Sequence, residues 1–140
     1  EFFNANGGEV IDENSRKIRN ILNCDFIFKM EHAMALASIV VSRAGAGTIS
    51  ELCAAGKATI FVPSPVVAED HQTHNALSLV NSDAALMIKD ADADIELIGA
   101  IDNLISDKEK IAQMEKNILA LAKPNAAEVI AKEILNLIRR

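Results

Sequence analysis

Apolar and polar positions along the chain predict short buried strands separated by helices. The β-branched run at residues 39–41 and the apolar run at residues 59–62 are typical of buried strands, and residues 84–88 form a third candidate. Residues 24–28 have the pattern of a strand end. Strands that alternate with helices indicate right-handed crossovers and a parallel sheet. The predicted fold class is therefore α/β, a Rossmann-like parallel sheet flanked by helices.

Apolar residues recur at helical spacing between these strands. Residues 30–37 carry one such stripe, and residues 48–55 are predicted to form a helix that ends at Gly56, a common helix terminator. A helix over residues 70–80 follows the second strand. Ligands of such sheets bind beyond the carboxyl ends of the strands, so the loops that enter these last two helices are the candidate site.

Three further amphipathic helices are predicted after the third strand. Their apolar faces are formed, in chain order, by Ile98, Ile101 and Ile105, by Ile111, Met114, Ile118 and Leu121, and by Ile130, Ile134, Leu137 and Ile138. The sequence Ser106-Asp107-Lys108-Glu109 has the spacing of a capping box at the start of the second of these helices. Asn125 is the candidate cap of the last one.

The start of the chain is its least regular part. Residues 4–8 are turn-like, and residues 12–20 are charged and predicted to be irregular or briefly helical. We therefore divide the chain into an N-terminal segment of residues 1–20, a domain of residues 21–124 and a C-terminal helix of residues 125–140. The chain does not begin with Met, which predicts that it is part of a longer protein.

Composition narrows the class of protein. A chain of 140 residues is long enough for one domain with its own core. Its net charge of −6 argues against nucleic-acid binding and against a polybasic membrane contact. No apolar stretch approaches the roughly 20 residues of a membrane helix. Cys24 and Cys53 are far apart and are predicted to act as small buried hydrophobic residues.

The loop of residues 43–48 has the composition of a phosphate-binding turn. It joins a predicted strand to a helix and contains only small residues after its arginine. Small side chains let a ligand approach the backbone, and the helix N-terminus offers free N–H groups with a partial positive charge. Gly45 and Gly47 have the spacing of a dinucleotide fingerprint, but Ser50 replaces its third glycine. A diphosphate is therefore favoured over a nicotinamide or flavin cofactor.

Glu51 and Arg43 each have two interpretations from the residues alone. Thr48 and Glu51 have the spacing of a capping box, in which Glu51 accepts from the first amide of the helix. Alternatively, the Glu51 carboxylate accepts both hydroxyls of a ribose whose diphosphate lies at the helix N-terminus. Arg43 either pairs with an acidic neighbour or neutralises the diphosphate.

A second group of polar side chains opens the helix after the second predicted strand. Asp70 is its candidate N-cap. His71 and His74 beside Asp70 imitate a metal site, but their spacing is common and a fourth ligand is not evident, so metal binding is not predicted. Gln72 and Asn75 carry amides suited to bidentate contacts with sugar hydroxyls. Their alternative role is the solvated first turn of the helix.

Four ordered motifs resemble the MurG family of N-acetylglucosaminyltransferases. They are Phe26-Ile27-Phe28-Lys29-Met30, the stretch from Ser42 to Glu51, Ala54-Ala55-Gly56-Lys57 with Phe61-Val62-Pro63, and Asp70-His71-Gln72-Thr73-His74-Asn75-Ala76. The resemblance implies a GT-B fold, in which two Rossmann-like domains enclose the active site, and makes this chain the C-terminal domain that binds UDP-N-acetylglucosamine. It also implies that the full-length protein converts lipid I to lipid II in peptidoglycan synthesis, and so serves cell wall biogenesis, cell shape and cell division.

The resemblance assigns donor-binding roles to individual residues. These are the main chain of Ile27 for uracil, Glu51 for ribose, Ala46, Gly47 and Thr48 for the diphosphate, and Gln72, with His71 and Asn75 beside it, for the sugar. Arg43 and the helix N-terminus would stabilise the UDP leaving group of an inverting displacement, with or without a divalent metal ion and without a tightly bound cofactor. The full-length protein is expected in the cytoplasm, peripheral on the inner face of the cell membrane.

The chain departs from the family pattern at Ala58, where proline is usual, and lacks the G-G-S-x-G-A loop of the first βα unit. An N-terminal domain, with the general base and the surface for the lipid-linked muramyl-pentapeptide, is also missing. We therefore expect no catalytic residue in this chain, which alone should bind the donor weakly and be inactive. Residues 125–140 are predicted to pack on the missing domain, or to pair in a homodimer. A stand-alone donor-binding subunit with a membrane-anchored partner and a nucleotide-sugar epimerase remain as alternatives.

Overall fold

The chain folds into two compact units, residues 1–35 and residues 36–140. The computed structural model describes residues 9–12, 15–18, 20–66 and 70–138. The boundary between the units falls inside residues 21–124, which we assigned from the sequence to one domain. The turn predicted at residues 4–8 lies outside the described residues.

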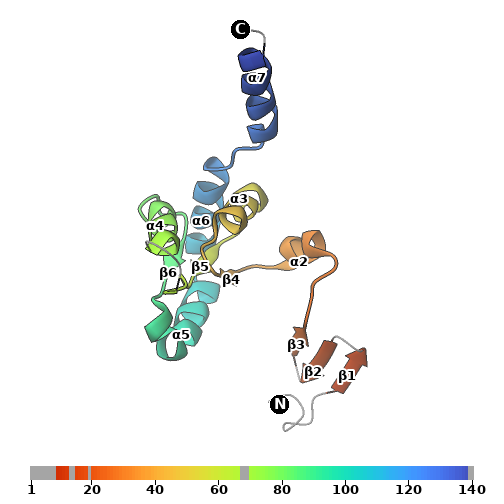
Figure 1. Ribbon diagram of the computed structural model, residues 1–140. Coiled ribbons are helices and arrows are strands. Elements are labelled where there is room, and N and C mark those ends of the chain that lie inside the picture. The colour runs from red at the N-terminus through yellow and green to blue at the C-terminus, as the bar shows by residue number, and fades with distance from the viewer. Residues whose placement is uncertain (1–8, 13–14, 19, 67–69, 139–140) are drawn as a thin grey trace. The chain divides into compact units, whose positions relative to one another are not determined.

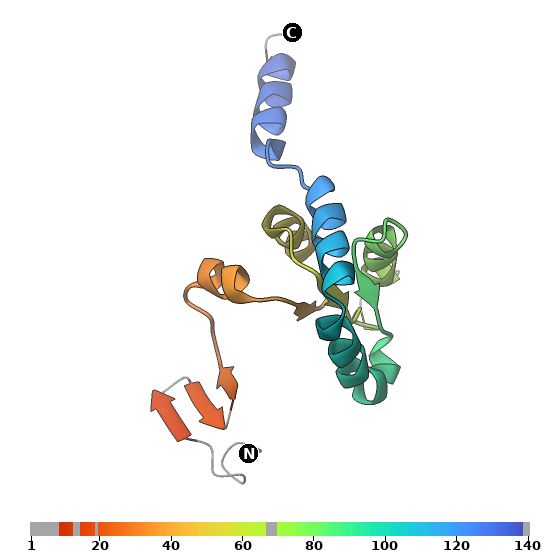
Figure 2. The same ribbon diagram turned by 180° about the vertical axis from the view of Figure 1, so that it is seen from behind.

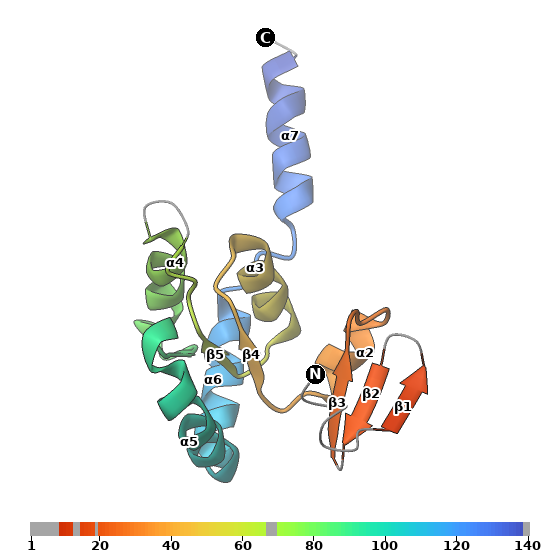
Figure 3. The ribbon, with the colours of Figure 1, turned by 60° about the horizontal axis from the view of Figure 1, so that its bottom comes forward.

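The first unit contains an antiparallel sheet. Its elements are β1 (Glu9–Asp12), β2 (Ser15–Ile18), β3 (Ile21–Cys24) and the helix α2 (Met30–Leu36), whose last residue is the first of the second unit. The strands lie side by side in the order β1-β2-β3 (Figure 3). The prediction of irregular or helical structure over residues 12–20 is therefore wrong for Ser15–Ile18, which form a strand because both neighbouring strands pair with them.

The strand end predicted at residues 24–28 is also displaced. Cys24 pairs with Ser15, the first residue of β2, so the ladder has no partner for the residues that follow Cys24. The strand therefore ends at Cys24, and Ile27 lies in the segment between β3 and α2.

The second unit is the predicted α/β fold (Figure 1). Its elements are β4 (Val40–Ser42), α3 (Ala46–Ala55), β5 (Thr59–Phe61), α4 (His71–Val80), β6 (Leu86–Met87), the 3-10 turn η2 (Asp90–Asp92), α5 (Ala93–Ser106), α6 (Lys108–Ala120) and α7 (Ala126–Ile138). The strands are parallel, in the order β4-β5-β6. Ser42 pairs with Phe61, and Phe61 with Met87, so the three strands end at one level. The predictions of strands near residues 39–41, 59–62 and 84–88 are confirmed.

The core lies on the two faces of β5. Side chains alternate across a strand, so Ile60 points to one face and Thr59 and Phe61 to the other, and all three are fully buried. Ile60 belongs to a cluster that includes Leu104 of α5 and Met114 of α6. In the view of Figure 2, α5 and α6 lie in front of the sheet. The helices α3 and α4 contribute further buried residues, which are Leu52, Cys53, Ala76 and Leu79.

The buried face of α5 differs from the predicted one. Ile98 and Ile105 are 68% and 53% exposed, whereas Leu104 is buried and Leu97 and Ile101 pack against the core cluster. Residues 97, 101 and 104 repeat at the i, i+4, i+7 spacing that keeps side chains on one face of a helix. Of the three isoleucines predicted to form the buried face, only Ile101 packs against the core.

Two helix ends are set by local chemistry. Gly56 ends α3 as predicted, with a left-handed φ of 62° that glycine adopts without strain, and its N–H donates to the Cys53 carbonyl at 3.2 Å. The cap of α6 is Asp107 rather than Ser106. Because that helix begins at Lys108, it is the Asp107 carboxylate that accepts from the Lys110 N–H, at 2.9 Å.

The last helix, α7, presents its apolar side chains to solvent. None of its described residues is buried, and Ile130, Ile134, Leu137 and Ile138 are all exposed. The helix predicted over residues 125–140 is confirmed for Ala126–Ile138, and residues 139–140 lie outside the described residues. In the part of the chain that the structure describes, no helix is both long and apolar enough to cross a membrane.

Candidate functional site

The candidate site lies at the carboxyl ends of the three parallel strands. The loops after β4 and β5 hold the residues singled out from the sequence, and the register brings them to one edge of the sheet. After β6, residues 88–89 and then the 3-10 turn η2 follow at this edge. Asp90, which follows β6, was not predicted as a site residue from the sequence, although the rule that ligands bind beyond the ends of parallel strands applies to this position as well.

The first turn of α3 has no side-chain cap. The N-cap is Gly45, in extended conformation, and the first intrahelical bond runs from the Ile49 N–H to the Gly45 carbonyl at 2.9 Å. The amides of residues 46–48 therefore precede this ladder. Such amides, with the helix dipole behind them, are suited to bind an anion.

The capping box predicted for Thr48 and Glu51 is absent. Because the helix begins at Ala46, Thr48 is already its third residue, the position where a box would need its Glu or Gln. Glu51 lies one turn further along, exposed, and cannot reach back to the first amide. Its side chain is exposed, one turn after the uncapped start of α3.

The peptide groups around Ala44 are held by two side chains of α4. Ala44 is fully buried, and its N–H donates to Gln72 Oε1 at 3.2 Å. The Asn75 Nδ2 group donates to the Ala44 carbonyl, also at 3.2 Å. Gln72 Oε1 accepts a second hydrogen bond, from the Ser64 N–H at 2.9 Å. The interpretation of Gln72 and Asn75 as a solvated first turn is therefore wrong, since both are half-buried and tie α4 to the loop that enters α3.

These contacts also fix the orientation of the Gln72 amide. Both partners of its side-chain oxygen are N–H donors, so the oxygen must point toward them and the NH2 group away. Within the described part of the chain, that NH2 group has no hydrogen-bond acceptor. It is therefore available to donate to a ligand.

Arg43 spans the ends of all three strands. Its Nη1 group donates to the carbonyls of Val62 at 3.1 Å and Pro63 at 3.3 Å, and forms an ion pair with the carboxylate of Asp90. Of its two predicted roles, pairing with an acidic neighbour is the one that the structure contains. The guanidinium is half-exposed, so part of it faces solvent.

Other predicted site residues take no part in the contacts above. His71 and His74 are exposed on α4, and Ile27 is exposed in the first unit. Asp70 is the N-cap residue of α4, as predicted, but it has a left-handed φ of 52° and its side chain makes no capping hydrogen bond. Among the described residues, no three His, Cys, Asp or Glu side chains gather as metal ligands.

Cys53 lies behind the loop, on the buried side of α3. Burial raises the pKa of its thiol above the ordinary value, because the thiolate would lose hydration. The thiol is therefore protonated at neutral pH, and Cys53 packs as a hydrophobic residue, as predicted. Cys24 is only half-buried.

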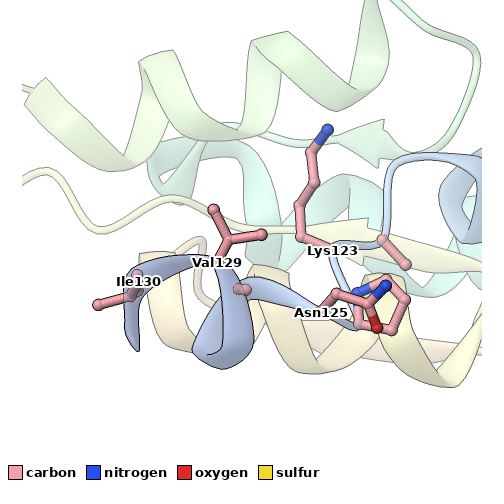
Figure 4. A pocket seen from close by; sticks show the side chains of 7 residues that line it. Lys123, Asn125, Val129 and Ile130 are labelled. Atoms are coloured by element: carbon pink, nitrogen blue, oxygen red, sulfur yellow. The ribbon is translucent and has the colours of Figure 1, made fainter. Parts of the chain in front are cut away.

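The described residues of the second unit line a cavity at the candidate site and another at a distinct place. One, of about 390 Å³, is at the candidate site and is lined by Pro63, Pro65, Asp70, Thr73, Met87, Lys89, Asp90 and Ala91. The other, of about 400 Å³, lies where α6 joins α7 (Figure 4). It is lined by Ala122, Lys123, Pro124, Asn125, Ala126, Val129 and Ile130, and shares no residue with the candidate site.

Comparisons with known proteins agree with this geometry. Residues 2–134 match the model of the glycosyltransferase family 28 C-terminal domain. The chain is 50% identical over 121 residues to the UDP-N-acetylglucosamine–N-acetylmuramyl-(pentapeptide) pyrophosphoryl-undecaprenol N-acetylglucosamine transferase of Bacteroides fragilis, a match covering 86% of this chain and 32% of that protein. It is 48% identical over 114 residues to the transferase of the same name from Parabacteroides distasonis, covering 81% and 31%.

A comparison with solved structures also finds a glycosyltransferase of this kind. The crystal structure of MurG from Acinetobacter baumannii superposes with a TM-score of 0.73 at 31% sequence identity, over 79% of this chain and 32% of that one. The chain thus spans about a third of the length of the curated relatives that it matches.

Proposed function

Because the chain belongs to the glycosyltransferase family 28 C-terminal domain family, we propose that it is the donor-binding part of a GT-B N-acetylglucosaminyltransferase. The complete enzyme would transfer N-acetylglucosamine from UDP to a lipid-linked muramyl-pentapeptide, which converts lipid I to lipid II in peptidoglycan synthesis. The names of the relatives support this reaction. They give no support to the epimerase alternative.

One observation carries the proposal. The uncapped first turn of α3 is followed one turn later by an exposed carboxylate, Glu51, and the loop that enters it is bound by an oriented amide, Gln72. A nucleoside diphosphate sugar needs these three kinds of group, for its diphosphate, its ribose hydroxyls and its sugar hydroxyls. The positions of the groups at one sheet edge support a single ligand that contacts all three.

The roles follow from the chemistry of each group. The amides of Ala46, Gly47 and Thr48 bind the diphosphate and stabilise the charge that develops on the UDP leaving group as the glycosidic bond breaks. Glu51 accepts from the ribose hydroxyls, and the main chain of Ile27 pairs with the uracil edge.

The sugar is bound from α4. The NH2 group of Gln72 donates to a sugar hydroxyl or to the acetamido carbonyl, and His71 lies next to it in the sequence. Asn75 acts indirectly, because its amide holds the Ala44 carbonyl and so fixes the loop that enters α3.

Catalysis requires sequence beyond this domain. Residues 21–124 supply the donor site, and the general base and the acceptor surface belong to the rest of the complete enzyme. Its lipid-linked acceptor places that enzyme at the inner face of the cell membrane as a peripheral protein. The exposed apolar face of α7 packs against the other GT-B domain or, in the isolated chain, against a second copy. The displacement proceeds with or without a divalent metal ion.

Calorimetric titration tests the donor site. The chain is expected to bind UDP-N-acetylglucosamine weakly, and UDP-glucose more weakly still, because the second sugar lacks the acetamido group. ADP-glucose should bind least, since the purine offers Ile27 a different hydrogen-bonding edge. Absence of heat with every UDP-sugar, at protein concentrations where the fold is intact by circular dichroism, would remove the support for this assignment.

The change Gln72→Glu separates the two functions of that side chain. A carboxylate still accepts from the Ala44 and Ser64 N–H groups, so the loop should stay in place and the melting temperature should change little. The change removes the NH2 donor and adds a negative charge near the ligand, so affinity for UDP-N-acetylglucosamine should fall about tenfold or more, the value of one hydrogen bond to a ligand. Affinity for UDP alone should fall much less. An equal loss for both ligands would place the role of Gln72 in the loop and not in sugar binding.

A further inference from the structure

The ion pair between Arg43 and Asp90 joins residues that lie at opposite sides of the sheet edge. Arg43 follows β4 and Asp90 follows β6, with β5 between them. The Arg43 side chain crosses the end of β5, where the carbonyls of Val62 and Pro63 accept from its Nη1 group at 3.1 and 3.3 Å. One guanidinium group thus connects the ends of all three strands.

The backbone next to Arg43 is held from a different direction. Ala44 is bound by Gln72 and Asn75 of α4, and Gly45 then begins α3. The chain therefore enters the proposed diphosphate turn between two anchors, one on the strand ends and one on α4. The first anchor depends on Asp90, because it supplies the only negative charge that the described structure pairs with Arg43.

We propose that Asp90 is a positioning residue for donor binding, which holds Arg43 across the end of β5 and so fixes the entry of the chain into the first turn of α3. This inference rests on the proposed function, since the turn that it positions is the proposed diphosphate site. It assigns Arg43 to the protein's own scaffold, in contrast to a direct contact with the diphosphate.

Because the Arg43–Asp90 ion pair is partly exposed, its loss is expected to affect donor binding more than folding stability. The Arg43 and Asp90 side chains are 54% and 35% exposed, and ion pairs in such positions contribute little to folding stability. Loss of the pair should therefore leave the domain folded. The backbone amides that face the diphosphate should become less well placed, because the order of the turn depends on both anchors.

The test uses donor kinetics of the complete transferase that carries this domain. Asp90→Ala should raise KM for UDP-N-acetylglucosamine, and Kd for UDP, by about fivefold to tenfold, within the range of couplings through contacting residues, and leave kcat within about twofold. Asp90→Glu should restore KM, because its carboxylate still reaches Arg43. Arg43→Met and the double variant should match Asp90→Ala, since the two residues act as one unit.

A matched control separates positioning from general destabilisation. Asn117→Ala removes two hydrogen bonds away from the sheet edge, one from Asn117 Nδ2 to the Asp83 carbonyl at 3.0 Å and one from Gln113 Nε2 to Asn117 Oδ1 at 2.7 Å. It should change the melting temperature by a similar amount without raising KM. Three results would overturn the inference: an unchanged or lowered KM in Asp90→Ala, a far larger loss in Arg43→Met than in Asp90→Ala, or an equal KM increase in Asn117→Ala. If the unsubstituted enzyme binds no UDP, the proposed function itself fails, which is a distinct outcome.

Discussion

Replacing Glu51 by alanine is expected to lower the affinity for UDP and UDP-N-acetylglucosamine about a hundredfold. A hydrogen bond to a charged group contributes about 1.5–3 kcal/mol, and the carboxylate is proposed to accept from two ribose hydroxyls, so the expected loss is about 3 kcal/mol. The fold should not suffer, because Glu51 is exposed and does not cap the helix in which it lies. Titration calorimetry with UDP measures the affinity, and thermal unfolding measures the stability.

Two control variants sharpen the interpretation of this result. Glu109→Ala makes the same change of charge near the start of another helix, α6, and should leave UDP binding unchanged. Glu51→Gln keeps the shape of the side chain but loses the charge, so it should retain part of the affinity. If Glu51→Ala binds UDP as well as the unsubstituted chain does, the carboxylate has no role in the donor site.

The parallel sheet was predictable because its central strand, β5, is buried on both faces. Such strands consist of short β-branched or apolar runs, and Thr59-Ile60-Phe61 of β5 is one of these, with every side chain fully buried. The hairpin of β1 and β2 has no comparable signal. Its described side chains are largely exposed and its sequence is rich in charge, so the pattern resembles a loop. Only the pairing between strands defines it.

The start of α3 was misplaced for a local reason. Thr48 with Glu51 matches the statistical pattern of a capping box, whereas Gly45 carries no side chain that signals a cap. The burial of Ala44 decides the outcome, because its peptide must lie against α4, and the chain turns into the helix directly after it. This constraint is tertiary and is invisible in the local sequence around the loop.

The site could be located from the sequence but its internal contacts could not. The rule that ligands bind beyond the carboxyl ends of parallel strands led directly to the loop that contains Arg43 and to the start of α4, which contains Gln72. The partners of these side chains lie 47 and 28 residues away, at Asp90 and at the backbone of Ala44. Many polar residues stand at such separations, and only the register of the sheet selects the ones in contact.

Replacing Gly47 by alanine should move stability and affinity in opposite directions. Gly47 lies in the first turn of α3, outside the left-handed region of the backbone, and a Cβ atom there would meet nothing within 4 Å. Alanine is the better helix former, so the free energy of unfolding should rise by about 0.5–1 kcal/mol. The open space is where the diphosphate is proposed to approach the backbone. A methyl group would push it away, and overpacking of about 1–3 kcal/mol corresponds to a loss of affinity for UDP of about tenfold to a hundredfold.

Gly99→Ala is the matched control for this experiment. Gly99 lies inside α5, where an added methyl group would also meet nothing within 4 Å, so it should give the same gain in stability and no change in UDP binding. The contrast between the two glycines tests the site more directly than a loss of function alone. A variant that is more stable yet binds less cannot owe its defect to unfolding, so a weakened Gly47→Ala protein would place the diphosphate at the backbone of α3. If both glycine variants bind UDP normally, the diphosphate does not approach α3 at Gly47, and the small residues of this loop serve only the close packing of Ala44 against α4.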